Sequence, residues 1–312
     1  MKKHILLLSV FLLFGTLPGF AVEPAPAPVS GPMKIETFHD QLFFVTIRIE
    51  TKLKDGIGVS TGFVVEYPVD KDKRLFFLVT NRHAVEQAET GKFFFMRSDG
   101  LNPILGERYD ININNFKASW FGHPDPGIDV AIMPLGPVLS EIDRKGWKIF
   151  FKSIPVDVFT SDREARELDA IEEIIFVGYP NGLFDVKNYL PVARKGTTAT
   201  PLMVDYNGRP EFMIDASVFL GSSGSPVFLS RHPADPGGSE RPYFLGLVSG
   251  SAFRAESGTI DFMKSPDQSA AVFNYNQLLN LGVVVKARAV AETITDWVNR
   301  NKVSLIKEVG LS

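Results

Sequence analysis

The stretch IDASVFLGSSGSPVF at residues 214–228 contains the turn G-S-S-G-S-P, residues 221–226, between two apolar runs. Gly221 and Gly224 allow the backbone to turn tightly and to direct the N–H groups of Gly221 and Ser223 into one small pocket. Such a pocket stabilises the negative oxygen that forms when a serine hydroxyl attacks a carbonyl group. Glycine, serine and proline also form ordinary turns between strands. The interpretation of Ser223 as a nucleophile therefore depends on a base and an acid elsewhere in the chain.

Five histidines are candidates for the base, and four of them lie near the N-terminus or in loops: His4, His39, His123 and His232. His83 differs because it closely follows the strand-like run 78–80 and precedes Ala84 and Val85, the predicted first turn of a short helix. A single histidine in this setting is more often a packed structural residue, so the base also requires a suitable acid.

Asp129 is the candidate acid, because it stands at the mouth of the otherwise apolar strand IDVAI, residues 128–132. Burying a carboxylate costs several kcal/mol unless it is paired, so an acid in such a place has a partner or is exposed. In a Ser-His-Asp arrangement the acid fixes the histidine tautomer that accepts the serine proton. His83 as that partner would place all three side chains at strand ends, facing one cleft.

Short runs rich in Val, Ile, Phe and Thr, separated by turn residues, form two groups and predict two antiparallel barrels, at about 35–140 and 165–285. The runs are 42–49, 58–67, 75–80, 92–96 and 130–134, then 174–177, 190–193, 196–200, 212–216, 227–229, 243–249 and 271–275. Residues 288–301 predict a helix that packs on the second barrel, because their apolar side chains fall on one face: Val290, Ile294, Trp297 and Val298. The domain is therefore expected to cover 35–312.

The first 21 residues have the parts of a secretory signal peptide: Lys2 and Lys3, an apolar run at 5–14, and Gly19-Phe20-Ala21. We expect cleavage near Ala21 and a mature protein in the periplasm or outside the cell. The apolar run is much shorter than the roughly 20 residues that cross a bilayer, and no later stretch is long enough. Residues 22–34, which begin VEPAPAPVSGP, predict an extended tether.

The charge and the cysteine count exclude several classes of function. The net charge is −3, and loss of Lys2 and Lys3 with the signal peptide changes it to −5, which gives no basic surface for nucleic acid. The chain has no cysteine, so it has neither a disulfide nor a thiol nucleophile. The histidines lack the spacing of metal ligands, and we expect no metal and no cofactor.

Five segments of the chain resemble those of trypsin-fold serine peptidases: STGFV at 60–64, LVTNRHAV at 78–85, IDVAIM at 128–133, VGYPNGL at 177–183 and residues 214–228. They are most similar to the bacterial branch that includes HtrA/Deg proteases and glutamyl endopeptidases. The resemblance extends from about residue 42 to about residue 285. It implies two six-stranded antiparallel barrels of the chymotrypsin-like kind, without the PDZ domain of complete HtrA proteases.

The resemblance also assigns roles to individual residues. His83 would be the general base, Asp129 the acid that orients it and Ser223 the nucleophile, with an oxyanion hole from the N–H groups of Gly221 and Ser223. Ser249 would begin the strand that pairs with the substrate backbone. The implied function is an exported serine endopeptidase that hydrolyses peptides or proteins through an acyl-enzyme.

The chain departs from the family pattern around the serine. Ser222 stands where the digestive branch has the aspartate that receives a newly cut N-terminus, so activation by such a cut is not expected. The family positions of the substrate pocket carry neither an aspartate for basic residues nor a histidine for acidic ones: Ser217, Val218, Ser249, Gly250 and Ser251. These residues predict a shallow, neutral pocket for small or medium aliphatic side chains. Asp215 is interpreted as a buried structural acid.

Two alternatives belong to other classes. An α/β-hydrolase esterase would have a G-x-S-x-G elbow and its histidine after the serine. G-S-S-G-S fits the elbow only loosely because it lacks the final glycine, and the only later histidine is His232, nine residues on. A catalytically silent or partner-activated protein of the same fold would instead bind extended peptides in the cleft. The polar loops predicted at 231–241 and 253–268 are long enough to cover that cleft. No sequence feature indicates an oligomeric state.

Overall fold

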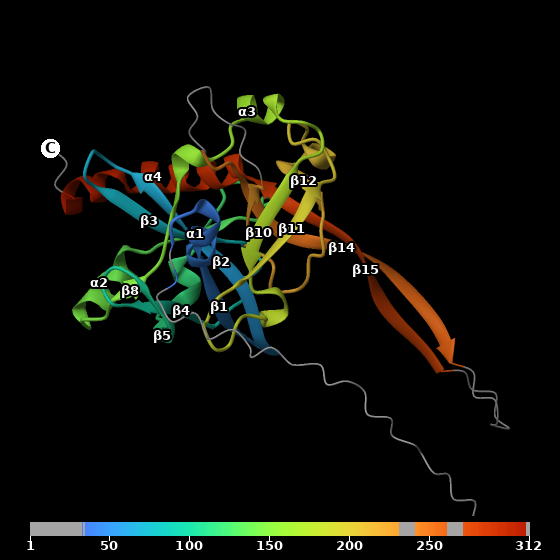
Figure 1. Ribbon diagram of the computed structural model, residues 1–312, viewed down its shortest axis with the longest axis horizontal. Helices are drawn as coiled ribbons and strands as arrows, with labels where there is room; N and C mark the ends of the chain where they lie inside the picture. Colours follow the sequence, from blue (N-terminus) through green and yellow to red (C-terminus); the bar gives the residue numbers. More distant parts are fainter. Residues whose placement is uncertain (1–32, 34, 231–240, 261–270, 310–312) are drawn as a thin grey trace, which may run out of the picture. The chain divides into compact units, whose positions relative to one another are not determined.

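The computed structural model describes residue 33 and residues 35–230, 241–260 and 271–309 (Figure 1). Residues 254–260, 271–276 and 302–309 are described as backbone only. The expected signal peptide at 1–21, the expected tether except for residue 33, and the loop from residue 231 to residue 240 lie outside the described residues.

The first half of the chain forms a nine-stranded sheet with the order β5-β4-β1-β2-β3-β7-β6, while β8 pairs with β4 and β9 runs parallel to β2. Its strands are β1 (Thr46–Leu53), β2 (Gly56–Pro68), β3 (Arg74–Thr80), β4 (Thr90–Ser98), β5 (Pro103–Ile113), β6 (Phe121–Gly122), β7 (Ala131–Pro134), β8 (Ile149–Phe150) and β9 (Ile154–Pro155). Buried and partly exposed side chains alternate along β4, where Phe93 and Phe95 are buried and Phe94 between them is partly exposed.

The second half forms a closed barrel with the order β10-β11-β12-β15-β14-β13. Its strands are β10 (Glu173–Gly178), β11 (Val192–Thr198), β12 (Glu211–Asp215), β13 (Pro226–Leu229), β14 (Phe244–Ile260) and β15 (Ala271–Lys286). Figure 1 shows that β14 and β15 continue past the other strands of the barrel as a two-stranded hairpin.

The structure confirms an all-β fold of two antiparallel units with a C-terminal helix, which is the architecture of chymotrypsin-like double barrels. The second unit is a closed barrel of six strands, as predicted. The first unit has nine strands rather than six. The difference comes from β6, β8 and β9, which contain two residues each and extend a framework of six longer strands.

The prediction of a loop at 253–268 is wrong for the first part of this segment. β14 continues to Ile260, and its pairing with β15 runs from Phe253 opposite Leu278 to Ile260 opposite Ala271. The polar residues of this segment do not end the strand, because the partner strand continues the backbone hydrogen bonding beyond the barrel. Residues 261–268 lie outside the described part of the chain.

Four α-helices lie among the described residues: α1 (Phe38–Val45), α2 (Gly136–Arg144), α3 (Asp162–Glu167) and α4 (Ala287–Val309). Residues 42–45, predicted as the start of a strand, belong to α1. A capping box begins this helix, because the Thr37 hydroxyl accepts from Asp40 N at 3.2 Å and Thr37 N donates to the Asp40 carboxylate at 2.9 Å.

Helix α4 packs against both units, whereas the sequence predicted contact with the second barrel alone. Val290 and Ile294 are fully buried in a cluster to which both units contribute. The Trp297 ring lies 5.2 Å from the Phe77 ring of β3, measured between centroids. The helix therefore ties the end of the chain to the first sheet as well as to the barrel from which it emerges.

Apolar side chains from both units meet between them. Phe63 of β2 lies 5.3 Å from Phe244 of β14, and Phe228 of β13 lies 5.5 Å from the same ring. Two further clusters fill the interiors of the first and second units. Burial of such rings contributes roughly 1.5–3 kcal/mol each, so the contact between the units is part of the core.

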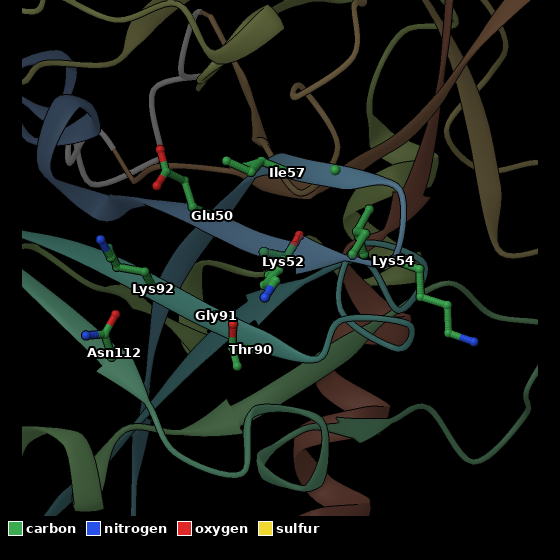
Figure 2. A pocket seen from close by; sticks show the side chains of 11 residues that line it. Glu50, Lys52, Lys54, Ile57, Thr90, Gly91, Lys92 and Asn112 are labelled. Carbon is green, nitrogen blue, oxygen red and sulfur yellow. The ribbon is translucent and has the colours of Figure 1, made fainter.

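A groove of about 460 Å³ lies on the first sheet beside the turn between β1 and β2 (Figure 2). Lys52, Lys54 and Lys92 line it together with Glu50. None of the predicted site residues is among its lining residues, so the groove is separate from the candidate active site described next.

Candidate active site

The turn at 221–226 joins the segment after β12 to β13 and needs glycine at two positions. Gly221 has a φ of +82° and Gly224 a φ of +85°. A Cβ atom on Gly224 would lie 1.9 Å from the carbonyl oxygen of Thr61 in β2. Thr61 N donates to Ser223 O at 3.0 Å, and the Thr61 hydroxyl donates to Gly221 O at 3.0 Å. A strand of the first unit therefore fixes the backbone of a turn in the second unit.

His83 lies in the turn that follows β3 and contacts both other candidate residues. Its Nδ1 is 2.7 Å from Asp129 Oδ2, and its Nε2 is 3.2 Å from Ser223 Oγ. Its backbone N–H also donates to Asp129 Oδ1 at 3.0 Å. A carboxylate can only accept, so Nδ1 carries the proton and Nε2 of the neutral ring is free to accept one from Ser223. The short helix predicted after His83 is a series of turns at 82–87.

The electrostatics of His83 follow from these contacts. The hydrogen bond to Asp129 raises the pKa of His83 above its ordinary value of 6.5, against the opposing effect of burial. Its side chain is 49% exposed and that of Asp129 is 25% exposed. Both side chains of the pair are therefore in part accessible to solvent.

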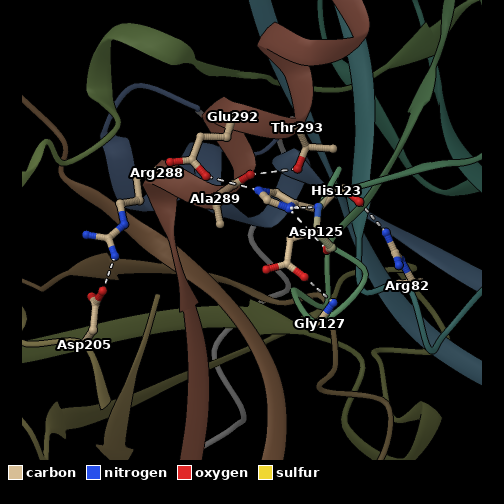
Figure 3. Close-up of polar contacts among 9 residues, drawn as sticks. All are labelled: Arg82, His123, Asp125, Gly127, Asp205, Arg288, Ala289, Glu292 and Thr293. Carbon is tan, nitrogen blue, oxygen red and sulfur yellow. Dashed lines mark hydrogen bonds and ion pairs between the residues drawn. The ribbon is translucent and has the colours of Figure 1, made fainter. Parts of the chain in front are cut away.

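The segment that carries Asp129 is held by its neighbours (Figure 3). Arg82, next to His83, donates to His123 O at 2.6 Å and to Pro126 O at 3.2 Å. Asn81 Nδ2 donates to Asp129 O at 2.9 Å. Two residues beside the base therefore bind the backbone around the acid, which fixes the distance between them.

His123, predicted as a loop residue, is buried and joins this segment to α4. Its Nδ1 accepts from Asp125 N at 3.0 Å, so its Nε2 donates to the Glu292 carboxylate at 3.1 Å (Figure 3). The side chain is 7% exposed. The contact gives His123 a structural role at the junction of the first unit and the helix.

The backbone around Gly221 leaves two N–H groups available. Leu220 O accepts from Asn181 N at 2.5 Å. The peptide bond between Leu220 and Gly221 is trans, so the N–H of Gly221 points away from that carbonyl. Within the described residues neither this N–H nor that of Ser223 donates to an acceptor. Both donors are thus available for a negative oxygen beside Ser223.

The five residues predicted for substrate binding lie on two segments beside the serine. Val248, next to Ser249 in β14, accepts from Gly224 N at 2.8 Å and donates to Ser225 O at 2.9 Å. Ser249, Gly250 and Ser251 are partly exposed in the continuation of that strand.

The other two predicted residues, Ser217 and Val218, precede the turn. Ser217 is exposed, whereas Val218 is buried. A Cβ atom on Gly282 would lie 2.6 Å from Val218 Cγ2, so the valine fills the space in front of β15. The interpretation of Asp215 as a buried acid is wrong, because this residue is exposed at the end of β12.

Sequence reasoning missed Arg194. Its Nη1 donates to Ser217 O at 2.5 Å and its Nη2 to Ser222 Oγ at 2.7 Å. The runs predicted at 190–193 and 196–200 placed Arg194 between strands, but β11 passes through it. The available sequence signal was Ser222, because a serine beside this turn needs a hydrogen-bond partner if it is buried.

The described residues contain no cluster of three or more His, Cys, Asp or Glu side chains that would hold a metal ion. Among the described residues no helix is long and apolar enough to cross a membrane.

Neither a protein-family model nor a curated protein sequence matches this chain. It is similar to solved structures, among them Rv3671c from Mycobacterium tuberculosis, an inactive serine-to-alanine mutant, with 17% identity, 86% of this chain and 96% of that chain covered, and a TM-score of 0.41. The serine endoprotease from Yersinia pestis is 10% identical, with 85% of this chain and 68% of that chain covered and a TM-score of 0.45. The protease Anisep from Arthrobacter nicotinovorans is 13% identical, with 80% of this chain and 94% of that chain covered and a TM-score of 0.41. These solved structures are serine proteases of the trypsin/chymotrypsin fold.

Proposed function

We propose that this protein is a serine endopeptidase that hydrolyses peptide bonds through an acyl-enzyme. The hydrogen-bonded chain from Ser223 to His83 at 3.2 Å and from His83 to Asp129 at 2.7 Å carries the proposal. The available N–H groups of Gly221 and Ser223 support it, because they supply the donors that an oxyanion needs.

The geometry supports a two-step reaction. Ser223 Oγ attacks the carbonyl carbon of the substrate while His83 Nε2 accepts the hydroxyl proton and Asp129 stabilises the imidazolium. The oxyanion binds the N–H groups of Gly221 and Ser223. The C–N bond then breaks, Nε2–H protonates the leaving amine, and an acyl-Ser223 ester remains. Water, deprotonated by His83, hydrolyses that ester and restores the serine.

The pocket residues support a preference on the acyl side of the cleaved bond. Val218 occupies the space before Gly282, and Ser217 offers no charge. A basic substrate side chain would find no carboxylate at Ser217 or Val218, and burying it unpaired would cost several kcal/mol. We therefore propose small or medium aliphatic residues at this position. A peptide library, analysed for the residue before each cleaved bond, tests this preference, and a dominant preference for Arg or Lys would contradict it.

The composition of residues 1–21 supports export, so we propose that the mature protein acts in the periplasm or outside the cell. Its substrates are then peptides or proteins present there. Fractionation of cells that express the full chain, with N-terminal sequencing of the product, tests the compartment and cleavage near Ala21.

The deciding experiment is covalent labelling of the purified protein with a fluorophosphonate, followed by mapping of the adduct. A competent Ser-His-Asp site places the adduct on Ser223. The Ser223→Ala variant is expected to remain unlabelled, while Ser140→Ala, which alters an exposed serine on α2, is expected to label like the wild type. A folded wild-type protein that is not labelled would favour the alternative of a silent peptide-binding protein.

A further inference from the structure

Arg194 is a partly buried cation on β11 of the second barrel, beside the turn that carries Ser223. It stands on β11 opposite Phe176 of β10, and its guanidinium lies 4.4 Å from the centroid of the Phe176 ring. Burial lowers the pKa of Arg194 to about 10, so the side chain is still protonated at neutral pH.

The guanidinium connects both ends of the segment 217–222. One nitrogen donates to Ser217 O and the other to Ser222 Oγ, at 2.5 and 2.7 Å. Ser222 is fully buried, and its hydroxyl oxygen also accepts from Phe219 N at 3.3 Å. Arg194 therefore closes a loop that contains Leu220 and Gly221, the residues whose peptide orientation makes the Gly221 N–H available.

Nothing in the described part of the chain neutralises this cation, because none of the described carboxylates lies within ion-pair distance of Arg194. A charge that is partly buried without a counter-ion loses hydration, and a hydrophobic residue in such a place is often neutral or stabilising. Stability alone therefore does not account for the arginine, whereas its two hydrogen bonds act directly on the loop before the nucleophile.

We propose that Arg194 is the positioning residue that holds the segment 217–222 in the conformation that presents the Gly221 N–H to the oxyanion. It acts through Ser222 and Ser217 and does not touch the substrate. This inference rests on the proposed function and deepens it, because an internal side chain then does what a new chain terminus would otherwise have to do. The site is ready for catalysis without a cut in the chain.

The conformation that would compete with the one observed differs in the orientation of a single peptide group, Leu220–Gly221. If the guanidinium is removed, the hydrogen bond from Asn181 N to Leu220 O is left to hold the Leu220–Gly221 peptide in its orientation. Rotation of that peptide would turn the carbonyl toward the site and remove the N–H from it. Loss of one oxyanion donor lowers kcat by roughly 10²–10³.

The test compares Arg194→Met with Lys195→Met, which alters the adjacent, exposed residue of the same strand. Arg194→Met is expected to lower the rate of peptide hydrolysis and of fluorophosphonate labelling by about 10²-fold, with the Lys195 variant within about twofold of the wild type. Arg194→Ala should recover activity when guanidinium is added, since the ion can occupy the vacated site. The downfield proton resonance of the His83–Asp129 hydrogen bond should persist in all three variants.

A second measurement separates this inference from the proposed function. In a Ser223→Ala background, the backbone amide signal of Gly221 is followed by NMR with and without Arg194→Met. A signal that shifts or splits supports the positioning role, even if the wild-type protein proves not to hydrolyse peptides. An unchanged Gly221 signal, an Arg194→Met enzyme as active as the wild type, or an Arg194→Ala enzyme that guanidinium does not rescue would overturn it.

Discussion

At Ser223, the hydrogen-bond chain gives each of three side chains a different task in the proposed reaction. The Asp129 carboxylate can only accept a hydrogen bond, so it keeps the proton of the neutral His83 ring on Nδ1. The unprotonated Nε2 then faces the serine. Replacement of the acid by an amide reverses this preference, because an amide nitrogen donates and favours the other tautomer.

We predict that Asp129→Asn lowers kcat by roughly 10⁴ while the fold is kept. His83→Ala and Ser223→Ala should each lower kcat on the order of 10⁶, and the double variant should be no worse than either single one, because the residues act as a unit. Steady-state kinetics on one peptide, with thermal unfolding as a check of folding, measure these effects. Normal turnover by Asp129→Asn would mean that a different acid serves His83.

The pH dependence follows from the raised pKa of His83. The base must be neutral, so kcat/KM should increase as the pH rises through a value above 6.5. Protonated His83 stabilises the folded state, and that contribution is complete below pH 6.5 and is lost as the pH rises through the folded-state pKa. A kcat/KM profile from pH 5 to 9 measures the first effect. An inflection below 6.5 would show that the contact with Asp129 does not dominate.

Residue types narrowed the candidates, and the resemblance to trypsin-fold peptidases selected the three residues that the structure brings together. Arg194 and Asp215 show where this reasoning stops. The partners of Arg194 are 23 and 28 positions away, and its contact with them depends on how β11 faces the loop before the turn. The exposure of Asp215 depends on which side of the end of β12 is covered, and the local sequence does not contain that information.

Among the elements, the turn at 221–226 depends on β2 of the other unit. The carbonyl oxygen of Thr61 occupies the space that a side chain at position 224 would need. The positive φ of Gly224 adds a second obstacle to substitution. Steric contact and backbone strain can be separated, because Gly208 has a positive φ of +72° while a Cβ atom added there would have no neighbouring atom within 4 Å.

We predict that Gly224→Ala destabilises the protein by more than about 3 kcal/mol and abolishes labelling of Ser223, since the turn must move away from β2. Gly208→Ala should cost about 1 kcal/mol and leave labelling unchanged, because backbone strain alone applies there. Urea unfolding and fluorophosphonate labelling of both variants test the difference. Equal losses of stability would show that the contact with Thr61 is not what requires glycine at position 224.

Element boundaries were harder to predict than element types. Residues 42–45, LFFV, have the apolar and aromatic composition of a strand, but the capping box at Thr37 starts a helix that continues through them. β14 extends through a polar segment because β15 pairs with it residue by residue. The extension of β14 depends on a partner strand outside the local pattern, whereas the start of α1 depends on the adjacent residues Thr37 and Asp40. The apolar runs within each barrel were predictable because their neighbours bury them.

For the whole molecule, the contact between the units decides whether the site exists, because Ser223 belongs to one unit and His83 and Asp129 to the other. The rings of Phe63 and Phe244 pack across this contact, and α4 adds Trp297 against Phe77. The two-unit architecture was predictable from the grouping of strands. The position of α4 against both units was not, since its apolar face is compatible with packing on either one.

The residues before the domain should have no part in activation. Where a new N-terminus activates a protease of this fold, its ammonium group needs a buried carboxylate beside the nucleophile, and here Ser222 occupies that position and receives Arg194 instead. We predict that variants that begin at different points between Val22 and Pro32 have the same kcat/KM and the same labelling rate. The measurement compares several such purified forms, with Arg194→Met as the form expected to be impaired whatever its first residue. Activity that appears only after one defined cut would contradict the prediction, because the chain end would then supply what Arg194 is proposed to provide.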